Sequence, residues 1–333
     1  MLLLVYVLVS ILMIEFALHR AKPLREAERV LQGSDRYMAY RRRDTHLWTR
    51  WRLYLFGIPL MLPRFLLILV CVFCHGLISA AALCGAEVGD NVLISPMRRK
   101  IVKLSSFFWT RLLLIAAGFW RVTEKGARDP RACVIVCNHS SWVDIMYFLS
   151  AQELPSFLAN AGVKRMPLIG TIAIAMHSVF FNRTSKDDRA STLSIVEERQ
   201  RRIYAQEGFP QLLLFPEGTT TNGSGLLYFR KGAFITGVPV QPVAIRYPFR
   251  HFSPTMDSIP MLPQVILLCC QLYNSMEVTR METVELPNKT AEERAQTVRE
   301  KIAQQLGVPL LSDRFEDKFE FIEFAFRTKA KHS

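Results

Sequence analysis

The chain has 333 residues, a formal charge of +13, a mean hydropathy of +0.16 and 50% apolar residues. This apolar fraction excludes a disordered chain, and 21% charged residues exclude a transporter that lies mostly within lipid. The positive charge favours an anionic partner, either nucleic acid or a phospholipid surface. The seven cysteines lie in apolar runs, so we expect most of the thiols to be buried and no disulfide framework.

Residues 1–19 are predicted to form a transmembrane helix. Positions 1–18 read MLLLVYVLVSILMIEFAL, in which Glu15 is the only charge. A cleaved signal peptide starts with a basic region, whereas no basic residue precedes His19 and Arg20 here. The run is close to the minimum of roughly 17 residues for a membrane helix, so we expect an uncleaved one.

A basic linker is predicted over residues 20–52. It carries ten Lys and Arg residues against four Asp and Glu residues, a net charge of +6 and nearly half of the total. The positive-inside rule places such a segment in the cytosol. We therefore expect this linker to lie against an anionic leaflet.

Residues 53–120 are predicted to form a membrane-embedded hairpin and an interfacial helix. The run 53–83 contains Pro59, Pro63 and Arg64, and it is shorter than the roughly 40 residues that two crossings need. It fits one span after Arg64 or a re-entrant hairpin bent at the prolines. Basic clusters on both sides favour the hairpin. Residues 104–120 favour an amphipathic interfacial helix, with a core helix of the next domain as the alternative.

From Arg121 to residue 310 the composition is that of an α/β domain. Short apolar runs alternate with helical patterns, which predicts a mostly parallel sheet flanked by helices. The predicted strands are 133–137, 178–181, 211–215 and 240–245, and the predicted helices include 187–206 and 291–306. Thr290 and Glu293 predict a capping box, and Gly307 predicts the helix end. Residues 311–333 are predicted to be a C-terminal tail.

His139 and Asp144 form the first candidate constellation, in the sequence Asn-His-Ser-Ser-Trp-Val-Asp that follows the 133–137 strand. Such strand ends are where α/β sheets usually bind ligands. Positions i and i+5 do not share a helix face, but the side chains can meet if Ser140 or Ser141 caps a helix that carries Asp144. Asp144 would then orient His139 as a general base. A helix-capping histidine in a solvated loop is the alternative.

Three further motifs accompany predicted strands. Phe215-Pro-Glu-Gly-Thr-Thr-Thr-Asn222 follows the 211–215 strand, and its glycine lets a ligand approach the backbone; a plain turn is the alternative. Arg183 follows the 178–181 strand and suits a bidentate phosphate contact, with a surface salt bridge as the alternative. Residues 237–243 (GVPVQPV) suit the wall of an apolar channel or an edge strand.

In this order, the four motifs resemble those of the PlsC-like glycerolipid acyltransferase superfamily, over roughly residues 121–310. FPEGTTTNG and the KRMPLIG sequence at 164–170 are similar to the lysophosphatidylcholine and lysophosphatidylethanolamine acyltransferase branch. Many animal members of that branch carry an EF-hand region. The DxDxDG pattern of an EF-hand loop does not occur in this sequence, so calcium control is not implied.

The resemblance implies an acyl-CoA:lysophospholipid acyltransferase. His139 would deprotonate the free hydroxyl of the lysophospholipid, which attacks the thioester of acyl-CoA, and Asp144 would orient His139. Acyl-CoA is a co-substrate, and direct transfer of this kind needs no metal and no cofactor. Lysophosphatidylcholine or lysophosphatidylethanolamine is the favoured acceptor.

The resemblance also assigns the residues that bind the acceptor. Arg183 would hold its phosphate, and its glycerol end would be positioned by Glu217, Gly218 and Thr219. Asn182 stands where the family usually has an acidic residue, which leaves the electrostatics at Arg183 open. Cys133 and Cys137 flank the site, but nothing nearby would lower a thiol pKa, so covalent catalysis is not expected.

Several alternatives remain open at this stage. A lysophosphatidate or glycerol-3-phosphate acyltransferase, or a CoA-independent transacylase, would use the same dyad. A serine hydrolase needs a GxSxG elbow, which Gly223-Ser-Gly225 does not match. A membrane-shaping hairpin protein with an inert domain belongs to a different class. Nucleic acid is not expected as a partner, because the basic residues cluster beside apolar segments. Headgroup, acyl-chain length, number of spans and oligomeric state stay open.

Two clues favour a cytosolic domain at the endoplasmic reticulum membrane. The chain ends in Lys-Ala-Lys-His-Ser, which resembles the KxKxx retrieval signal, with a solvated basic tail as the alternative. N-x-S/T sequons begin at Asn138, Asn182, Asn222 and Asn288. Three of these lie within the site motifs, so a lumenal domain would risk glycans in its own active site. The cytosolic pool of acyl-CoA agrees with this orientation.

Overall fold

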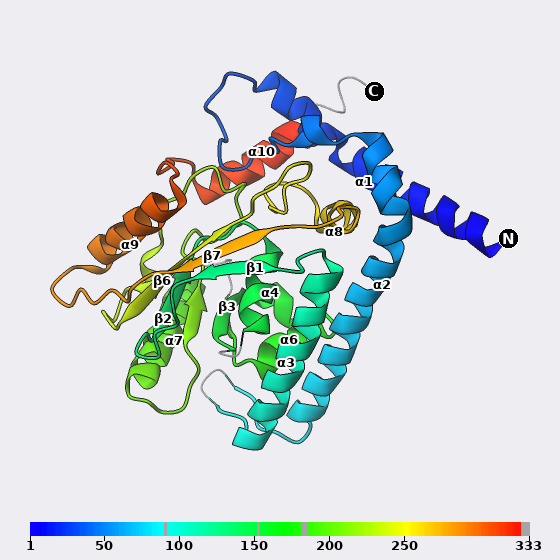
Figure 1. Ribbon diagram of the computed structural model, residues 1–333. Coiled ribbons are helices and arrows are strands. Elements are labelled where there is room, and N and C mark those ends of the chain that lie inside the picture. The colour runs from blue at the N-terminus through cyan, green and yellow to red at the C-terminus, as the bar shows by residue number, and fades with distance from the viewer. Residues whose placement is uncertain (90–91, 152–153, 182–185, 328–333) are drawn as a thin grey trace.

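A mixed sheet of seven strands forms the centre of the computed structural model, which describes residues 1–89, 92–151, 154–181 and 186–327 (Figure 1). The strand order is β1-β7-β6-β2-β5-β3-β4, and neighbours are parallel except for β6 and β7. The mostly parallel α/β sheet predicted from the sequence is confirmed. The strands are β1 (Val122–Lys125), β2 (Val134–Cys137), β3 (Ser156–Asn160), β4 (Val179–Phe181), β5 (Leu212–Leu214), β6 (Val240–Arg246) and β7 (Met276–Arg280).

The strands that the apolar runs predict are β2, β4, β5 and β6. The sequence did not predict β1, β3 and β7, and β1 and β7 carry charged residues in short, partly exposed segments. The edge-strand interpretation of residues 237–243 is wrong, because β6 lies between β7 and β2. Its pairing with β7 begins at Val243, so the missing N–H of Pro242 lies outside that ladder.

Helices cover both faces of the sheet. On one face, α4 (Trp142–Ser150) and α8 (Met261–Cys269) share a core with Ile135 and Cys137, and the N-terminal helices extend this core. On the other face, α7 (Lys186–Tyr204) and α9 (Ala291–Leu306) pack against Val134 and Val136. The predicted capping box and the left-handed Gly307 of α9 are confirmed. Two shorter helices, α5 (Ala161–Lys164) and α6 (Ile169–Ala175), precede β4.

The first helix, α1, spans Leu2–Val30 and is longer than the predicted 1–19. Its second half buries Ala21, Leu24 and Ala27 at helical spacing against the domain, so it continues into the predicted linker. The rest of the linker is also packed in part. Arg41 is buried and pairs with Glu28 at 2.8 Å, so the basic charge is not spread uniformly over an exposed surface.

The predicted hairpin within 53–83 is wrong, because α2 is one continuous helix over Arg50–Leu83 that contains both prolines. Proline at position 63 removes the hydrogen bond that would normally reach the carbonyl of Pro59. The hydroxyl of Tyr6 in α1 donates to that carbonyl at 3.1 Å and to the carbonyl of Ile58 at 2.8 Å. The Tyr6 hydroxyl thus replaces the hydrogen bond that the Pro59 carbonyl loses, and the helix continues past both prolines. The helical hairpin that does form joins α2 to α3 (Pro96–Ala116).

One face of α2 is buried along the whole helix. Its buried residues recur every three or four positions from Leu53 to Ala82, which is the pattern of a helix lying on a protein surface. Gly76 sits where an added Cβ would lie 2.7 Å from the Leu168 side chain, so a small residue is required at that contact. This packing brings α2 against α3, α6 and α8.

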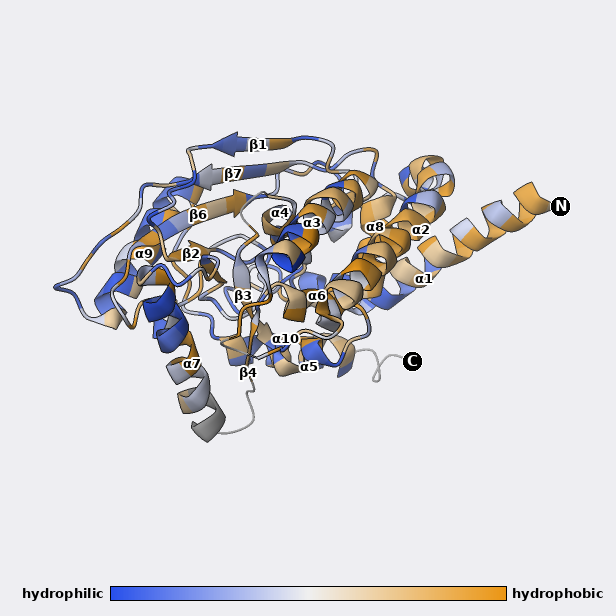
Figure 2. Ribbon diagram, turned by 90° about the horizontal axis from the view of Figure 1, so that it is seen from below, coloured by the Kyte–Doolittle hydropathy of each residue, from blue (hydrophilic) through white to orange (hydrophobic). Residues whose placement is uncertain are grey.

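The opposite faces of the first three helices form an exposed apolar surface. Figure 2 shows hydrophobic colour along α1, α2 and α3 on one side of the molecule, with the start of α1 projecting outward. The helices α1 and α2 are each long and apolar enough to cross a membrane. The helix α3 is apolar on both sides, since it buries Leu113 against the domain and exposes Phe107 and Phe108. Exposed apolar residues include Leu4, Leu8, Leu12, Leu66, Leu69, Phe73, Leu77 and Leu104.

The predicted tail contains a further helix, α10 (Phe315–Arg327). Its Phe321 is fully buried and packs against Tyr37 with the rings tilted, 5.6 Å apart between centroids. Figure 1 shows α10 beside the first helices, close to the C-terminus. The segment after residue 310 is therefore part of the folded domain, while the dibasic residues 329 and 331 lie outside the described residues.

Candidate active site

Three adjacent parallel strands end at the candidate site. β2 leads into His139, β5 leads into Glu217, and β6 leads into Tyr247. In register, Val136 pairs with Leu214 on one side and Pro242 on the other, so the three carboxyl ends lie at the same level. This is the edge of the sheet at which α/β proteins usually bind ligands.

His139 and Asp144 contact each other as the sequence predicted. His139 Nδ1 lies 2.9 Å from Asp144 Oδ2. Ser141 is the N-cap of α4, and Asp144 closes the capping box at the third helical position. His139 lies on the preceding turn, so the two side chains meet although they do not share a helix face. Asp144 is fully buried, whereas the side chain of His139 is 15% exposed.

The Asp144 carboxylate is held by donors that the sequence analysis missed. Its Oδ2 accepts the backbone N–H groups of Ser140 and Ser141, each at 2.8 Å. Its Oδ1 accepts the hydroxyl of Tyr247. Burial and the adjacent Asp144 carboxylate raise the pKa of Tyr247 well above its usual value, so Tyr247 stays protonated and donates. These donors stabilise the ionised carboxylate and fix it against His139.

The imidazole of His139 is also fixed by stacking. The Phe215 ring lies 4.0 Å away between centroids at an angle of 19°. With Nδ1 directed at Asp144, Nε2 is directed away from it, and no described residue donates to or accepts from Nε2. His139 can therefore act as a general base, because Asp144 holds Nδ1 and Nε2 can accept a proton from a substrate.

Glu217 is buried, and its carboxyl oxygens are bound to backbone amides. Its Oε1 accepts the backbone N–H of His139 at 2.8 Å, and its Oε2 accepts the N–H of Leu227 at 3.1 Å. Only 2% of the residue is exposed. Burial raises the pKa of Glu217 to about 7, against the backbone hydrogen bonds, which lower it. The FPEGT turn thus supports the backbone of His139 directly.

Glu217 should give the protein a pH-dependent stability. Its folded pKa of about 7 exceeds the usual 4.5, so the folded state retains a proton that the unfolded chain loses between these values. Stability should therefore fall as pH rises from 4.5 to 7, by on the order of 3 kcal/mol. Urea unfolding of the wild type and of Glu217→Gln in detergent measures this. We expect a flatter profile for Glu217→Gln, and equal slopes would contradict the assignment.

The neighbouring residues of the turn have separate roles. Gly218 has φ of 72°, and an added Cβ would lie 3.0 Å from the guanidinium carbon of Arg230. The left-handed backbone conformation therefore favours glycine, whereas the Arg230 side chain could move aside for a Cβ. The Thr219 hydroxyl lies 3.2 Å from Nζ of Lys318 in α10. The C-terminal helix thus contacts the FPEGT turn, a contact that the prediction of a tail did not include.

The remaining candidates are Arg183 and the two cysteines. Arg183 and Asn182 lie outside the described residues. Burial raises the pKa of Cys133 to about 11 and that of Cys137 well above its usual value. The expectation that neither thiol is activated is confirmed.

A cavity of about 620 Å³ adjoins the turn. Its lining includes Glu217 and Arg230 from the turn region and Arg299 from α9. Arg299 donates to the carbonyls of Leu226 and Leu311, each at 2.8 Å, which ties α9 to the segments around the cavity.

Comparison with known proteins points to acyltransferases. Residues 121–246 match the family model described as acyltransferase. Lysophospholipid acyltransferase LPEAT1 of Arabidopsis thaliana is 35% identical over 219 residues, 58% of this chain and 55% of that protein. Lysophosphatidylcholine acyltransferase 2 of Rattus norvegicus is 36% identical over 235 residues, 67% of this chain and 42% of that protein. The chain belongs to the glycerolipid acyltransferase superfamily.

The fold of the chain agrees with that of a solved structure. The crystal structure of PlsC, the 1-acyl-sn-glycerophosphate (LPA) acyltransferase from Thermotoga maritima, aligns with a TM-score of 0.51. The alignment covers 74% of this chain and 95% of that one at 20% identity, which shows a common fold. The chain spans about half the length of the curated relatives it matches, 55% of LPEAT1 and 48% of LPEAT2.

Proposed function

We propose that this acyltransferase transfers an acyl chain from acyl-CoA to the free hydroxyl of a lysophospholipid. The observation that carries the proposal is the His139–Asp144 pair, with Nδ1 bound to the carboxylate and Nε2 available at the carboxyl edge of the sheet. The relatives' names support a lysophospholipid acceptor. Lysophosphatidylcholine and lysophosphatidylethanolamine are the favoured acceptors.

The reaction follows from this pair. Nε2 of His139 takes the proton of the acceptor hydroxyl while the oxygen attacks the thioester carbonyl. The tetrahedral intermediate collapses with loss of CoA thiolate, which receives the proton from the imidazolium. Asp144 stabilises the imidazolium and keeps Nδ1 protonated in the resting state. The buried donors Ser140 N–H, Ser141 N–H and Tyr247 hydroxyl keep Asp144 in place.

An assay of acyl incorporation tests the proposal. Purified full-length protein is given labelled oleoyl-CoA and a panel of acceptors: lysophosphatidylcholine, lysophosphatidylethanolamine, lysophosphatidate and glycerol 3-phosphate. We expect transfer to the first two, and none with His139→Ala. A reaction that proceeds with a phospholipid donor and without CoA would identify a transacylase instead. If the wild type is no more active than His139→Ala with every acceptor, the protein is not an enzyme for these substrates and the inert-domain alternative is favoured.

Arg183 is proposed to hold the acceptor's phosphate, from its position after β4 and from the motif order. Arg183→Gln should raise KM for the lysophospholipid about 10- to 100-fold, the effect of one charge-assisted hydrogen-bonding pair, with KM for acyl-CoA unchanged. Steady-state kinetics with each substrate varied measures this. Arg230→Gln is the matched comparison, because Arg230 lies against Gly218. A KM effect confined to Arg230→Gln would transfer the phosphate role to that residue.

We further propose an endoplasmic reticulum membrane protein whose domain faces the cytosol. The apolar faces of α1, α2 and α3 would lie in the membrane, and the face of α2 buried along its length supports a helix lying on the domain. The side chain of Asn138 exchanges hydrogen bonds with Ile245 at 2.8 and 2.9 Å, which a glycan would break. Glycosylation of Asn138 or Asn222 in cells would refute the cytosolic orientation.

A further inference from the structure

The linker between α1 and α2 passes through the catalytic domain. Residues 38–44, here called the linker insert, lie between two loops that border the site. On one side, the backbone N–H of Asn222 donates to the Ala39 carbonyl at 2.8 Å. The Asn222 side chain donates to the carbonyls of Met38 and Arg41 at 2.7 and 2.9 Å. On the other side, the Ser258 hydroxyl donates to the Tyr40 carbonyl at 2.9 Å.

Arg42 is fully buried and makes most of the contacts between the linker insert and the loop around residue 255. Its guanidinium donates to the carbonyls of Ser253 and Thr255, each at 2.6 Å. It also pairs with Asp44 at 2.6 Å and with Asp257 at 3.3 Å. These partners compensate the burial of the charge. All of them except Asp44 belong to residues 253–257, here called the support loop.

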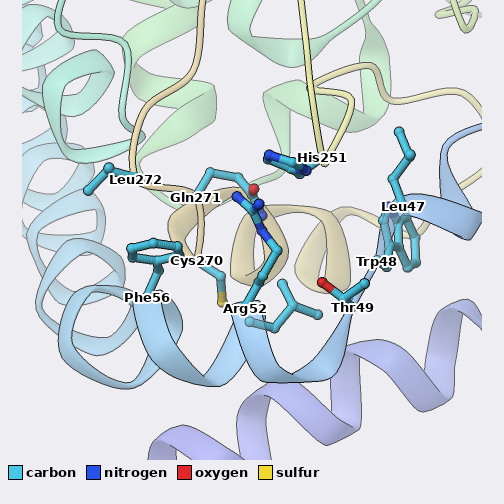
Figure 3. Close-up of a pocket in the computed structure, with 10 residues that line it drawn as sticks. Leu47, Trp48, Thr49, Arg52, Phe56, His251, Cys270, Gln271 and Leu272 are labelled. Carbon is cyan, nitrogen blue, oxygen red and sulfur yellow. The ribbon is translucent and has the colours of Figure 1, made fainter.

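Two aromatic rings pack against the guanidinium of Arg42. Its guanidinium carbon lies 4.7 Å from the centroid of Phe252 and 5.4 Å from that of Trp48. Asp44 additionally accepts the Trp48 indole N–H at 3.0 Å and the Ser253 N–H at 2.6 Å. Figure 3 shows the chain just beyond the insert, where Arg52, His251 and Gln271 gather between the start of α2 and the end of α8. The linker is thus docked along this side of the domain.

The support loop contacts the catalytic turn directly. The Ser141 hydroxyl donates to the Pro254 carbonyl at 2.8 Å, and the Met256 N–H donates to the Ser140 carbonyl at 2.7 Å. The backbone N–H groups of these two serines hold the Asp144 carboxylate. Arg42 and Asp144 are therefore connected through one short loop and one turn. The Thr220 hydroxyl, just after the FPEGT sequence, also donates to the Met256 carbonyl.

We propose that Arg42 is a positioning residue for the His139–Asp144 pair, acting through the support loop. The inference rests on the proposed acyltransfer. The two terminal nitrogens of the guanidinium each donate to one carbonyl and to one carboxylate, a fork that a lysine cannot reproduce. Loss of the fork releases the support loop, and the serine amides that orient Asp144 lose their fixed position. The buried charge of Arg42 thus holds the residues around the His139–Asp144 pair in position. Because Arg42 is buried, lipid headgroups cannot contact it.

The test compares Arg42→Lys and Arg42→Met with Arg43→Met, since Arg43 is the exposed neighbour with the same charge. Full-length protein is assayed in detergent below its melting temperature, with kcat and KM determined for acyl-CoA and for the acceptor. We expect kcat to fall about 10-fold in Arg42→Lys and about 100-fold in Arg42→Met, while both KM values stay within about 2-fold of wild type. Arg43→Met should match the wild type.

A double-mutant cycle separates positioning from a merely structural role. Ser141→Ala removes the bond to the support loop together with the N-cap of α4, so the part of its effect on kcat that comes from the loop should overlap the effect of Arg42→Lys in the double variant. If the Arg42 variants do not fold, Asp257→Asn tests the same connection, because it weakens the ion pair between Arg42 and the support loop. Folded Arg42→Lys with wild-type kcat, or independent effects in the cycle, would overturn the inference while leaving the proposed function intact. Equal losses in Arg42→Met and Arg43→Met would overturn it in favour of a surface-charge role. A wild type without acyltransferase activity would contradict the proposed function and, with it, the positioning role of Arg42.

Discussion

Asp144→Asn is expected to lower kcat by about 10³- to 10⁴-fold without unfolding the protein, the size of effect seen when a catalytic histidine loses its carboxylate partner. Asparagine fits the site. Its oxygen can occupy the Oδ2 position and accept from His139, Ser140 and Ser141. Its amide can occupy the Oδ1 position and donate to the Tyr247 oxygen. The substitution therefore removes the charge that stabilises the imidazolium and leaves the hydrogen-bond geometry in place.

Steady-state kinetics and a melting curve of Asp144→Asn measure the two parts of this expectation. Tyr247→Phe is the graded control, because it removes one donor to Asp144 and keeps the charge. We expect a decrease in kcat of about 10-fold for it, the equivalent of one buried hydrogen bond. Wild-type kcat in Asp144→Asn would show that His139 works without its carboxylate, and the proposed mechanism would fail.

Arg64→Leu is expected to cause a large loss of stability. Arg64 stands in the middle of the apolar helix α2 and is buried. Its guanidinium donates to the carbonyls of Cys269, Gln271 and Leu272, at and just beyond the C-terminus of α8. A positive charge is favourable at that end of a helix. Leucine would leave these carbonyls without their donor, at a cost on the order of 2–4 kcal/mol.

Thermal unfolding in detergent micelles measures this effect. Arg111→Leu is the matched control, since Arg111 also interrupts an apolar helix but is exposed. We expect its free energy of unfolding to change by less than about 0.5 kcal/mol. Equal melting temperatures of Arg64→Leu and the wild type would mean that α2 is not fixed to the domain by this contact.

The parts of the fold that could be predicted from the sequence are those with local signals. The strands of the sheet centre are short apolar runs, and α9 carries its capping box and its terminal glycine within 18 residues of chain, from Thr290 to Gly307. The His139–Asp144 contact was predictable for the same reason, because the N-cap at Ser141 brings the two residues together within one turn.

The missed residues depend on contacts between distant segments. Tyr247 is 103 residues from Asp144, and Arg42 is 215 residues from Asp257. An isolated tyrosine after a strand, or an arginine in a basic run, has no local pattern that distinguishes it. The hairpin prediction failed for a related reason. Prolines weaken a helix locally, and the compensating Tyr6 hydroxyl comes from another helix.

The linker insert also has a consequence for the order of events during synthesis. Arg42 leaves the ribosome long before Asp257, its partner 215 residues later. At about 5–20 residues per second, this interval lasts roughly 10–40 s. During that time the guanidinium has no support loop to bind, and the apolar helices on either side of it are already available to a membrane. Association of α1 and α2 with lipid would keep the insert close to the emerging domain, so that its last loops close onto a segment already in place.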